Sequence, residues 1–146
     1  MMRPGTAALL VAGALVPLLP RAVPALADAP DVVIAELMAS NANALILPDG
    51  SAPDWVELWN RGSAAADLAG WHLADSGATA FTFPAGTTLA PGARLLVYAD
   101  DGNVANPGLH APFKLSAGGE YLGLTDTGGT PVSEFAPAFP AQVNNI

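Results

Sequence analysis

The sequence predicts an all-β domain built as an antiparallel sandwich or barrel. From Val32 onward, short runs rich in β-branched and aromatic residues recur at near-regular spacing, and Gly, Pro, Asn or Asp separate them. This spacing is typical of sandwiches and barrels. After residue 27, no segment shows the amphipathic pattern of a helix over about ten residues.

The expected strands share this composition and end at turn residues. In chain order they are Val32–Met38, Asp54–Asn60, Trp71–Asp75, Phe81–Phe83, Arg94–Ala99, Phe113–Leu115, Tyr121–Thr125 and Val132–Phe135. The Ala-rich stretch Ser63–Asp67 is too short to be a helix by itself and is predicted to be a connection. Ser40–Pro53 and Asp100–Pro112 are longer than ordinary hairpin turns and are expected to be loops that can carry binding residues.

Residues 1–27 have the pattern of a secretory signal peptide. Arg3 precedes an apolar stretch from Ala7 to Leu19, and Ala25-Leu26-Ala27 forms a cleavage site of small residues. The alternative is a membrane anchor, but a spanning helix needs about 20 apolar residues and prolines interrupt this stretch. The sequence therefore predicts a secreted or extracytoplasmic protein, at the cell surface or in the periplasm, with no stable membrane insertion after cleavage.

The chain after the predicted cleavage site is strongly acidic. Residues 28–146 hold three basic residues, Arg61, Arg94 and Lys114, against thirteen acidic ones, which gives a net charge of −10. Such a surface repels nucleic acid and anionic lipid. The chain has no cysteine, so the core must stabilise the domain without disulfides.

The segment Asp54–Asn60 holds two of the three tryptophans and a glutamate between them. Side chains alternate along a strand, so Val56 and Leu58 share one face and Trp55, Glu57 and Trp59 share the other. A mid-strand glutamate is seldom buried unpaired, which places Val56 and Leu58 inward. Trp55 and Trp59, about 13 Å apart, then form an outer ligand platform suited to a sugar ring. The alternative is aromatic cover packed beneath a loop.

The sequence gives little support for catalysis. The chain has only two histidines, His72 and His110, and no G-x-S-x-G or H-E-x-x-H pattern. Both histidines are therefore expected to be solvated or hydrogen-bonded rather than catalytic. No organic cofactor is expected.

A calcium ion is the ligand that the sequence supports best. Asp100, Asp101 and Asn103 place hard oxygen ligands in one flexible loop, and calcium takes six to eight such ligands. The alternative is that Asp and Asn occur here because they are good turn formers.

The order of the segments, from Val32 to Phe139, resembles the bacterial lamin-tail domain. The segments that carry the resemblance are VVIAELMASN, DWVELWN, DLAGWHLAD, FPAGTTLAPGARLLVYA, FKLSAGGEYLGLTD and GTPVSEF. The resemblance implies an immunoglobulin-like antiparallel β-sandwich over residues 28–146 and a non-catalytic module. The positions that match the family's framework are Val56, Leu58, Gly70, Trp71, Leu73 and Phe83.

The expected function is an exported, non-catalytic binding or structural module that presents loops to a surface polysaccharide, a protein or an ion. The alternative is an N-terminal accessory fragment of a larger exported hydrolase or surface protein. The last strand of the sandwich is expected to be incomplete, because FAPAFPAQVNNI resembles only the start of the closing segment. An exposed sheet edge invites self-association.

Overall fold

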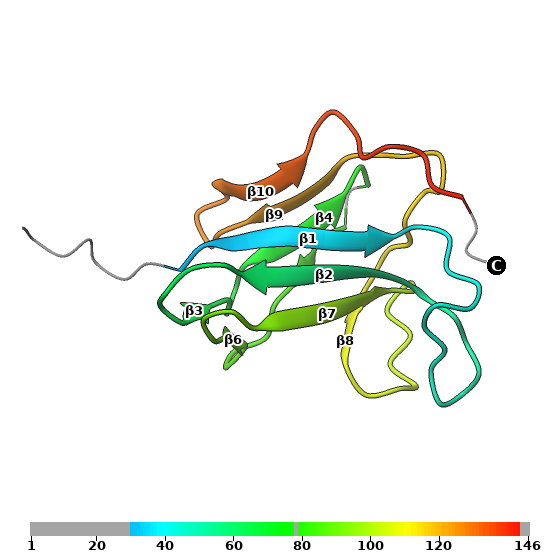
Figure 1. Cartoon of the computed structure of the whole chain (residues 1–146), viewed down its shortest axis with the longest axis horizontal. Helices are drawn as coiled ribbons and strands as arrows, with labels where there is room; N and C mark the ends of the chain where they lie inside the picture. The colour runs from blue at the N-terminus through cyan, green and yellow to red at the C-terminus, as the bar shows by residue number, and fades with distance from the viewer. Residues whose placement is uncertain (1–29, 78, 144–146) are drawn as a thin grey trace, which may run out of the picture.

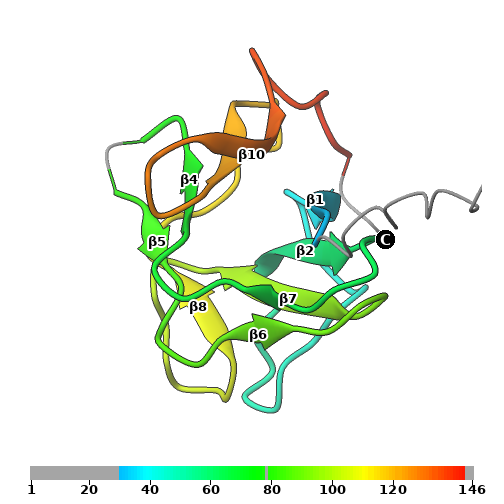
Figure 2. The ribbon, with the colours of Figure 1, turned by 90° about the vertical axis from the view of Figure 1, so that its left-hand side faces the viewer.

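Two four-stranded β-sheets face each other in the computed structural model, which describes residues 30–77 and 79–143 (Figures 1 and 2). In the first, the β1 sheet, the strand order is β1 (Val32–Met38), β2 (Asp54–Asn60), β7 (Arg94–Ala99) and β8 (Leu109–Ala111). In the second, the β10 sheet, it is β10 (Pro131–Phe135), β9 (Leu122–Thr125), β4 (His72–Asp75) and β5 (Phe81–Thr82). A short ribbon pairs β3 (Ala66–Asp67) with β6 (Thr88–Leu89).

The described residues confirm the all-β prediction, since none of them is helical. Accordingly, no helix in residues 30–77 and 79–143 has the length and apolarity needed to cross a membrane. The predicted signal peptide, residues 1–27, lies outside the described residues.

Alternation along the strands builds the core between the two sheets. In β2, Val56 and Leu58 are fully buried and Glu57 between them is half-buried on the outer face, as predicted. Apolar side chains from both inner faces interdigitate in this way in β-sandwiches. The largest fully buried apolar side chains are Phe83, Phe139, Leu58, Leu68, Leu73, Leu122, Leu124, Val56 and Val97.

The framework residues behave as the family resemblance implied. Leu73 and Phe83 are buried, and Trp71 is half-buried against the core cluster. Gly70 has a φ of +75°, a left-handed conformation that favours glycine.

Four segments differ from the sequence-based prediction, and one of them is Thr88–Leu89, which forms β6 although no strand was expected there. Phe113–Leu115 is not a strand: Phe113 and Leu115 are buried in the core, while their backbone forms no sheet pairing. The strand in this region is β8, inside the predicted loop Asp100–Pro112, and it runs parallel to β7. Ala66–Asp67, predicted to be part of a connection, forms β3 because β6 supplies a partner. Long-range pairing, rather than local composition, decides each of these cases.

Asn60, the last residue of β2, is a fully buried polar residue with a complete set of partners. Its Oδ1 accepts hydrogen bonds from the backbone N–H groups of Asp31 (3.1 Å) and Gly62 (3.0 Å). Its Nδ2 donates to the carbonyl oxygens of Ala64 (2.8 Å) and Leu89 (2.9 Å). One side chain therefore connects the start of β1, the turn after β2 and the end of β6.

We expect Asn60→Ala to lower the free energy of unfolding by about 3 kcal/mol, because four backbone groups, one buried and three partly buried, would lose their partner. Chemical denaturation measures this change. The matched control is Asn43→Ala in an exposed loop position, with an expected change below about 0.5 kcal/mol. Equal effects of the two substitutions would contradict the structural role assigned to Asn60.

Candidate functional site

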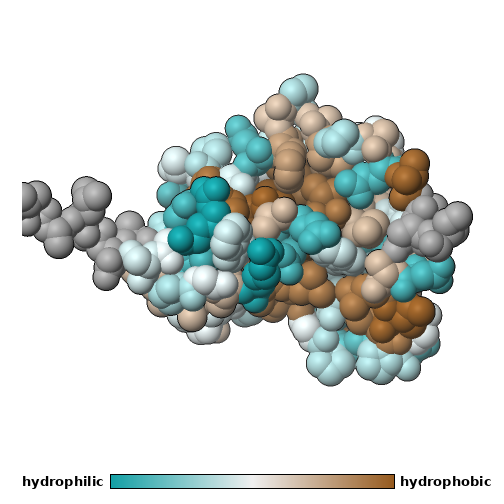
Figure 3. Space-filling model, viewed as in Figure 1, coloured by the Kyte–Doolittle hydropathy of each residue, from teal (hydrophilic) through white to brown (hydrophobic). Residues whose placement is uncertain are grey.

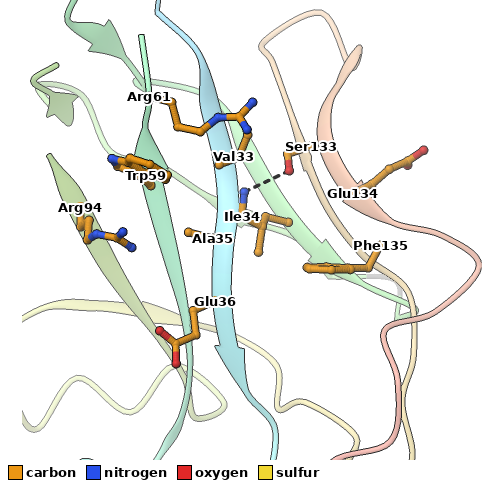
Figure 4. Close-up of a pocket in the computed structure, with 10 residues that line it drawn as sticks. All are labelled: Val33, Ile34, Ala35, Glu36, Trp59, Arg61, Arg94, Ser133, Glu134 and Phe135. Atoms are coloured by element: carbon orange, nitrogen blue, oxygen red, sulfur yellow. Dashed lines mark hydrogen bonds between the residues drawn. The ribbon is translucent and has the colours of Figure 1, made fainter. Parts of the chain in front are cut away.

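An open groove lies along β1, between the outer face of the β1 sheet and the neighbouring strand β10 (Figure 4). It has a volume of about 570 Å³. We call it the Trp59 groove, and its lining consists of Val33, Ile34, Ala35, Glu36, Trp59, Arg61, Arg94, Ser133, Glu134 and Phe135. Trp59 and Arg94 lie on one side of β1, and Ser133 and Phe135 on the other (Figure 4).

Arg94 connects two of the predicted platform residues. It lies directly across from Trp59 in the pairing of β2 with β7, and its guanidinium carbon is 4.7 Å from the centre of the Trp59 ring. The same guanidinium forms an ion pair with Glu57. Glu57 also faces Glu36 across the β1–β2 pairing, and opposed like charges destabilise a sheet. Arg94 offsets this repulsion and holds Glu57 beside Trp59.

Trp55 has a different environment from Trp59, although both side chains lie on the predicted outer face of β2. Its neighbours across the sheet are Met38 on β1 and Tyr98 on β7. Its Nε1 is buried and has no hydrogen-bond partner among the described residues. The structure therefore joins Glu57 and Trp59 through Arg94, while the polar end of Trp55 is covered. A sugar platform formed by Trp55, Glu57 and Trp59 stays a prediction.

Glu134 lines the Trp59 groove but directs its carboxylate away from β1 (Figure 4). The Tyr121 hydroxyl donates a hydrogen bond to this carboxylate at 3.1 Å. Burial raises the pKa of Tyr121, and the Glu134 carboxylate raises it further. Two acidic residues line the groove, Glu36 and Glu134, and Tyr121 binds the carboxylate of Glu134.

The two long loops meet at one end of the sandwich (Figure 1) and enclose a second hollow of about 230 Å³. Apolar side chains gather over the loop between β1 and β2 (Figure 3), where Ile46 is exposed. Asp54 begins β2 beside this hollow, and burial raises the pKa of its carboxyl group. The hollow is lined by Ser51, Ala52, Pro53, Asp100, Asn103 and Lys114.

Two of the three predicted calcium ligands, Asp100 and Asn103, line this hollow, and all three, Asp101 included, already have protein partners. Asp100 accepts hydrogen bonds from the Asn103 backbone N–H (3.2 Å) and from His110 Nδ1 (2.8 Å). Asp101 forms an ion pair with Lys114 at 3.1 Å, and the Asn103 side chain accepts from the Ala105 N–H at 3.3 Å. No three His, Asp or Glu side chains cluster as a metal site within residues 30–77 and 79–143. A calcium ion would have to compete with these contacts.

His110 has a structural role that could not be inferred from its position in the sequence. Its side chain is 1% exposed, and Nε2 lies 2.9 Å from the Asn106 carbonyl oxygen. Both of its partners, that oxygen and the Asp100 carboxylate, accept hydrogen bonds, so the geometry suits a ring that donates from both nitrogens. The ring also packs against Tyr98, with 5.0 Å between ring centres. His72 makes a hydrogen bond to Thr82 Oγ1 at 3.0 Å, so both histidines are hydrogen-bonded as expected.

The model of the family described as Lamin Tail Domain matches residues 26–137. The chain belongs to the lamin tail domain family. This match confirms the resemblance seen in the sequence and agrees with the two-layered immunoglobulin-like sandwich. Comparison with curated proteins gives no match.

In this lamin tail domain, we expect His110→Ala to lower the free energy of unfolding by about 2 kcal/mol, because Asp100 and the Asn106 carbonyl would lose a buried donor. Urea denaturation measures the change. His72→Ala is the control, since His72 is half-buried with one side-chain bond, and its expected effect is below about 1 kcal/mol. A larger effect at His72 would contradict this assignment.

Calcium binding at Asp100, Asp101 and Asn103 has a direct thermal test. An ion that binds only the native domain raises the unfolding midpoint in millimolar calcium chloride. Asp101→Asn should then remove the increase, and magnesium chloride at equal ionic strength controls for screening. An unchanged midpoint in calcium would dismiss the site.

Proposed function

We propose that this chain is an exported, non-catalytic binding module of the lamin-tail type. Its partner would be a polysaccharide or a protein of a cell surface, and the Trp59 groove would be the contact surface. The observation that carries the proposal is the stacking of Arg94 over Trp59. The pair lies in an open groove of about 570 Å³ that runs along the edge strand β1.

The groove has properties that suit binding. Trp59 and Arg94 belong to paired strands, so the sheet fixes their spacing rather than a mobile loop. Trp and Arg are enriched among the residues that dominate binding energies, because each combines a large contact area with directed polar groups. Arg94 is also half-exposed, which leaves guanidinium N–H groups accessible to a ligand.

The arrangement of the polar groups supports a binding role over a catalytic one. His110 and Asp100 hold the loop between β7 and β8 in place, and Glu57 pairs with Arg94. These side chains thus have structural partners instead of facing one shared reaction centre. The same surface would serve a free-standing module or the accessory part of a larger exported hydrolase.

A binding panel tests this function. The purified chain is titrated with neutral polysaccharides, uronic-acid polysaccharides and extended peptides, and binding is measured by calorimetry. Trp59→Ala should weaken the interaction that is found about tenfold, which corresponds to about 1.4 kcal/mol. Trp71→Phe, on the side of the β10 sheet, is the control and should leave affinity unchanged. The proposal fails if no member of the panel binds, or if Trp59→Ala leaves binding intact while the variant is folded.

A further inference from the structure

The edge of β1 is covered at two points by side chains instead of along its length by a neighbouring strand. Within its sheet β1 pairs only with β2, and its other side faces β10, the edge strand of the second sheet. The Ile34 N–H donates to Ser133 Oγ at 3.0 Å, and the Ala39 N–H donates to Gln142 Oε1 at 3.1 Å. Two backbone donors of this edge are thus satisfied by single side chains from the C-terminal part of the chain.

The Trp59 groove follows the same edge. Residues 33–36 of β1 line it, and Ala35 and Glu36 are exposed there. The register of β1 against β2 shifts between Ile34 and Glu36, so a β-bulge lies within the groove. Bulges are over-represented at sheet edges and binding sites, where they redirect the backbone. An exposed strand edge recognises extended polypeptides, because their N–H and C=O groups match its own spacing.

Charge distinguishes this groove from the rest of the surface. The described residues contain twelve acidic side chains and three basic ones. Two of the three bases, Arg61 and Arg94, line the groove, together with only two of the twelve acids, Glu36 and Glu134. Their side chains are 47% and 50% exposed, and each has one carboxylate partner, Asp31 or Glu57. A guanidinium carries five N–H donors, so both retain donors for an incoming carboxylate.

We infer that the Trp59 groove binds an extended polypeptide segment of another protein, one that carries a carboxylate side chain opposite Arg61 and Arg94. The backbone of the segment pairs with the β1 edge near Ala35, and an apolar side chain packs on Phe135. This inference rests on the proposed binding function and names the class of partner.

Two observations favour this occupant over the alternatives. Arg94 covers one face of Trp59 at 4.7 Å, so a sugar ring that stacked on that face would have to displace the guanidinium. A second copy of the chain carries a net charge of −8 and is repelled as a whole, whereas a short segment with one carboxylate can place that group directly against the two arginines of the groove.

The test is a selection from a displayed library of random segments of roughly ten residues, long enough to include one strand, against the immobilised full chain. We expect the selected sequences to alternate β-forming residues and to share an Asp or Glu at a fixed position. Arg94→Gln should weaken binding of the selected peptide about tenfold, as should Gln in place of its acid. The double change should cost little more than either alone, because the two groups interact.

Lys114→Gln is the matched control, because it removes the third cation of the described chain, which lies at the other hollow. Arg61→Lys and thermal unfolding of each variant separate a lost contact from a lost fold. A selected peptide without a conserved acid, or one that binds Arg94→Gln unchanged, overturns the inference. So does a dimer in light scattering that groove substitutions dissolve. Polysaccharide binding without peptide binding rejects this inference and leaves the proposed function standing, whereas no binding rejects both.

Discussion

The buried side chain of Asn60 is the interaction on which the geometry of this domain depends. It is an amide in an apolar interior with all its hydrogen-bonding capacity used, and each bond goes to backbone. An unsatisfied buried amide is costly, so few arrangements of the surrounding chain are compatible with it. By joining the start of β1 to the end of β6, Asn60 fixes where the edge strand begins and where β2 ends.

The inward direction of Asn60 also determines the exposed chemistry. Because strand side chains alternate, an inward Asn60 places Trp59 and Arg61 on the opposite face. The facing strand β7 then brings Arg94 opposite Trp59. The groove is therefore a consequence of how the core is packed, and its aromatic and cationic groups lie on the rigid part of the molecule. The long loops, by contrast, use most of their polar groups to fold themselves.

The sequence predicted the parts of the fold that depend on local pattern. Three strands, Val32–Met38, Asp54–Asn60 and Arg94–Ala99, have the predicted bounds, because alternating β-branched and aromatic residues identify them and turn residues end them. The segments predicted wrongly depend on distant partners: β8 exists because β7 offers a parallel edge, and β3 because β6 lies opposite. Phe113 and Leu115 have strand-like composition because they are buried, and burial alone does not create a pairing.

The candidate site was predictable to the same extent. Alternation placed Trp55, Glu57 and Trp59 on one face, but the ion pair of Glu57 joins residues 37 positions apart and leaves no local signal. The positions of Ser133 and Gln142 against β1 are likewise long-range results of the fold.

The hydrogen bonds from Ile34 to Ser133 and from Ala39 to Gln142 affect how this edge meets other protein chains. The hydrogen bonds between two paired strands break cooperatively. Two separate side chains, by contrast, can each rotate away from a backbone N–H group independently and at a small cost in free energy. The covered edge is thus shielded from fibrillar growth by default, yet it becomes available for brief intervals without unfolding of either layer. The edge can therefore take up and release a neighbouring strand while both sheets stay folded.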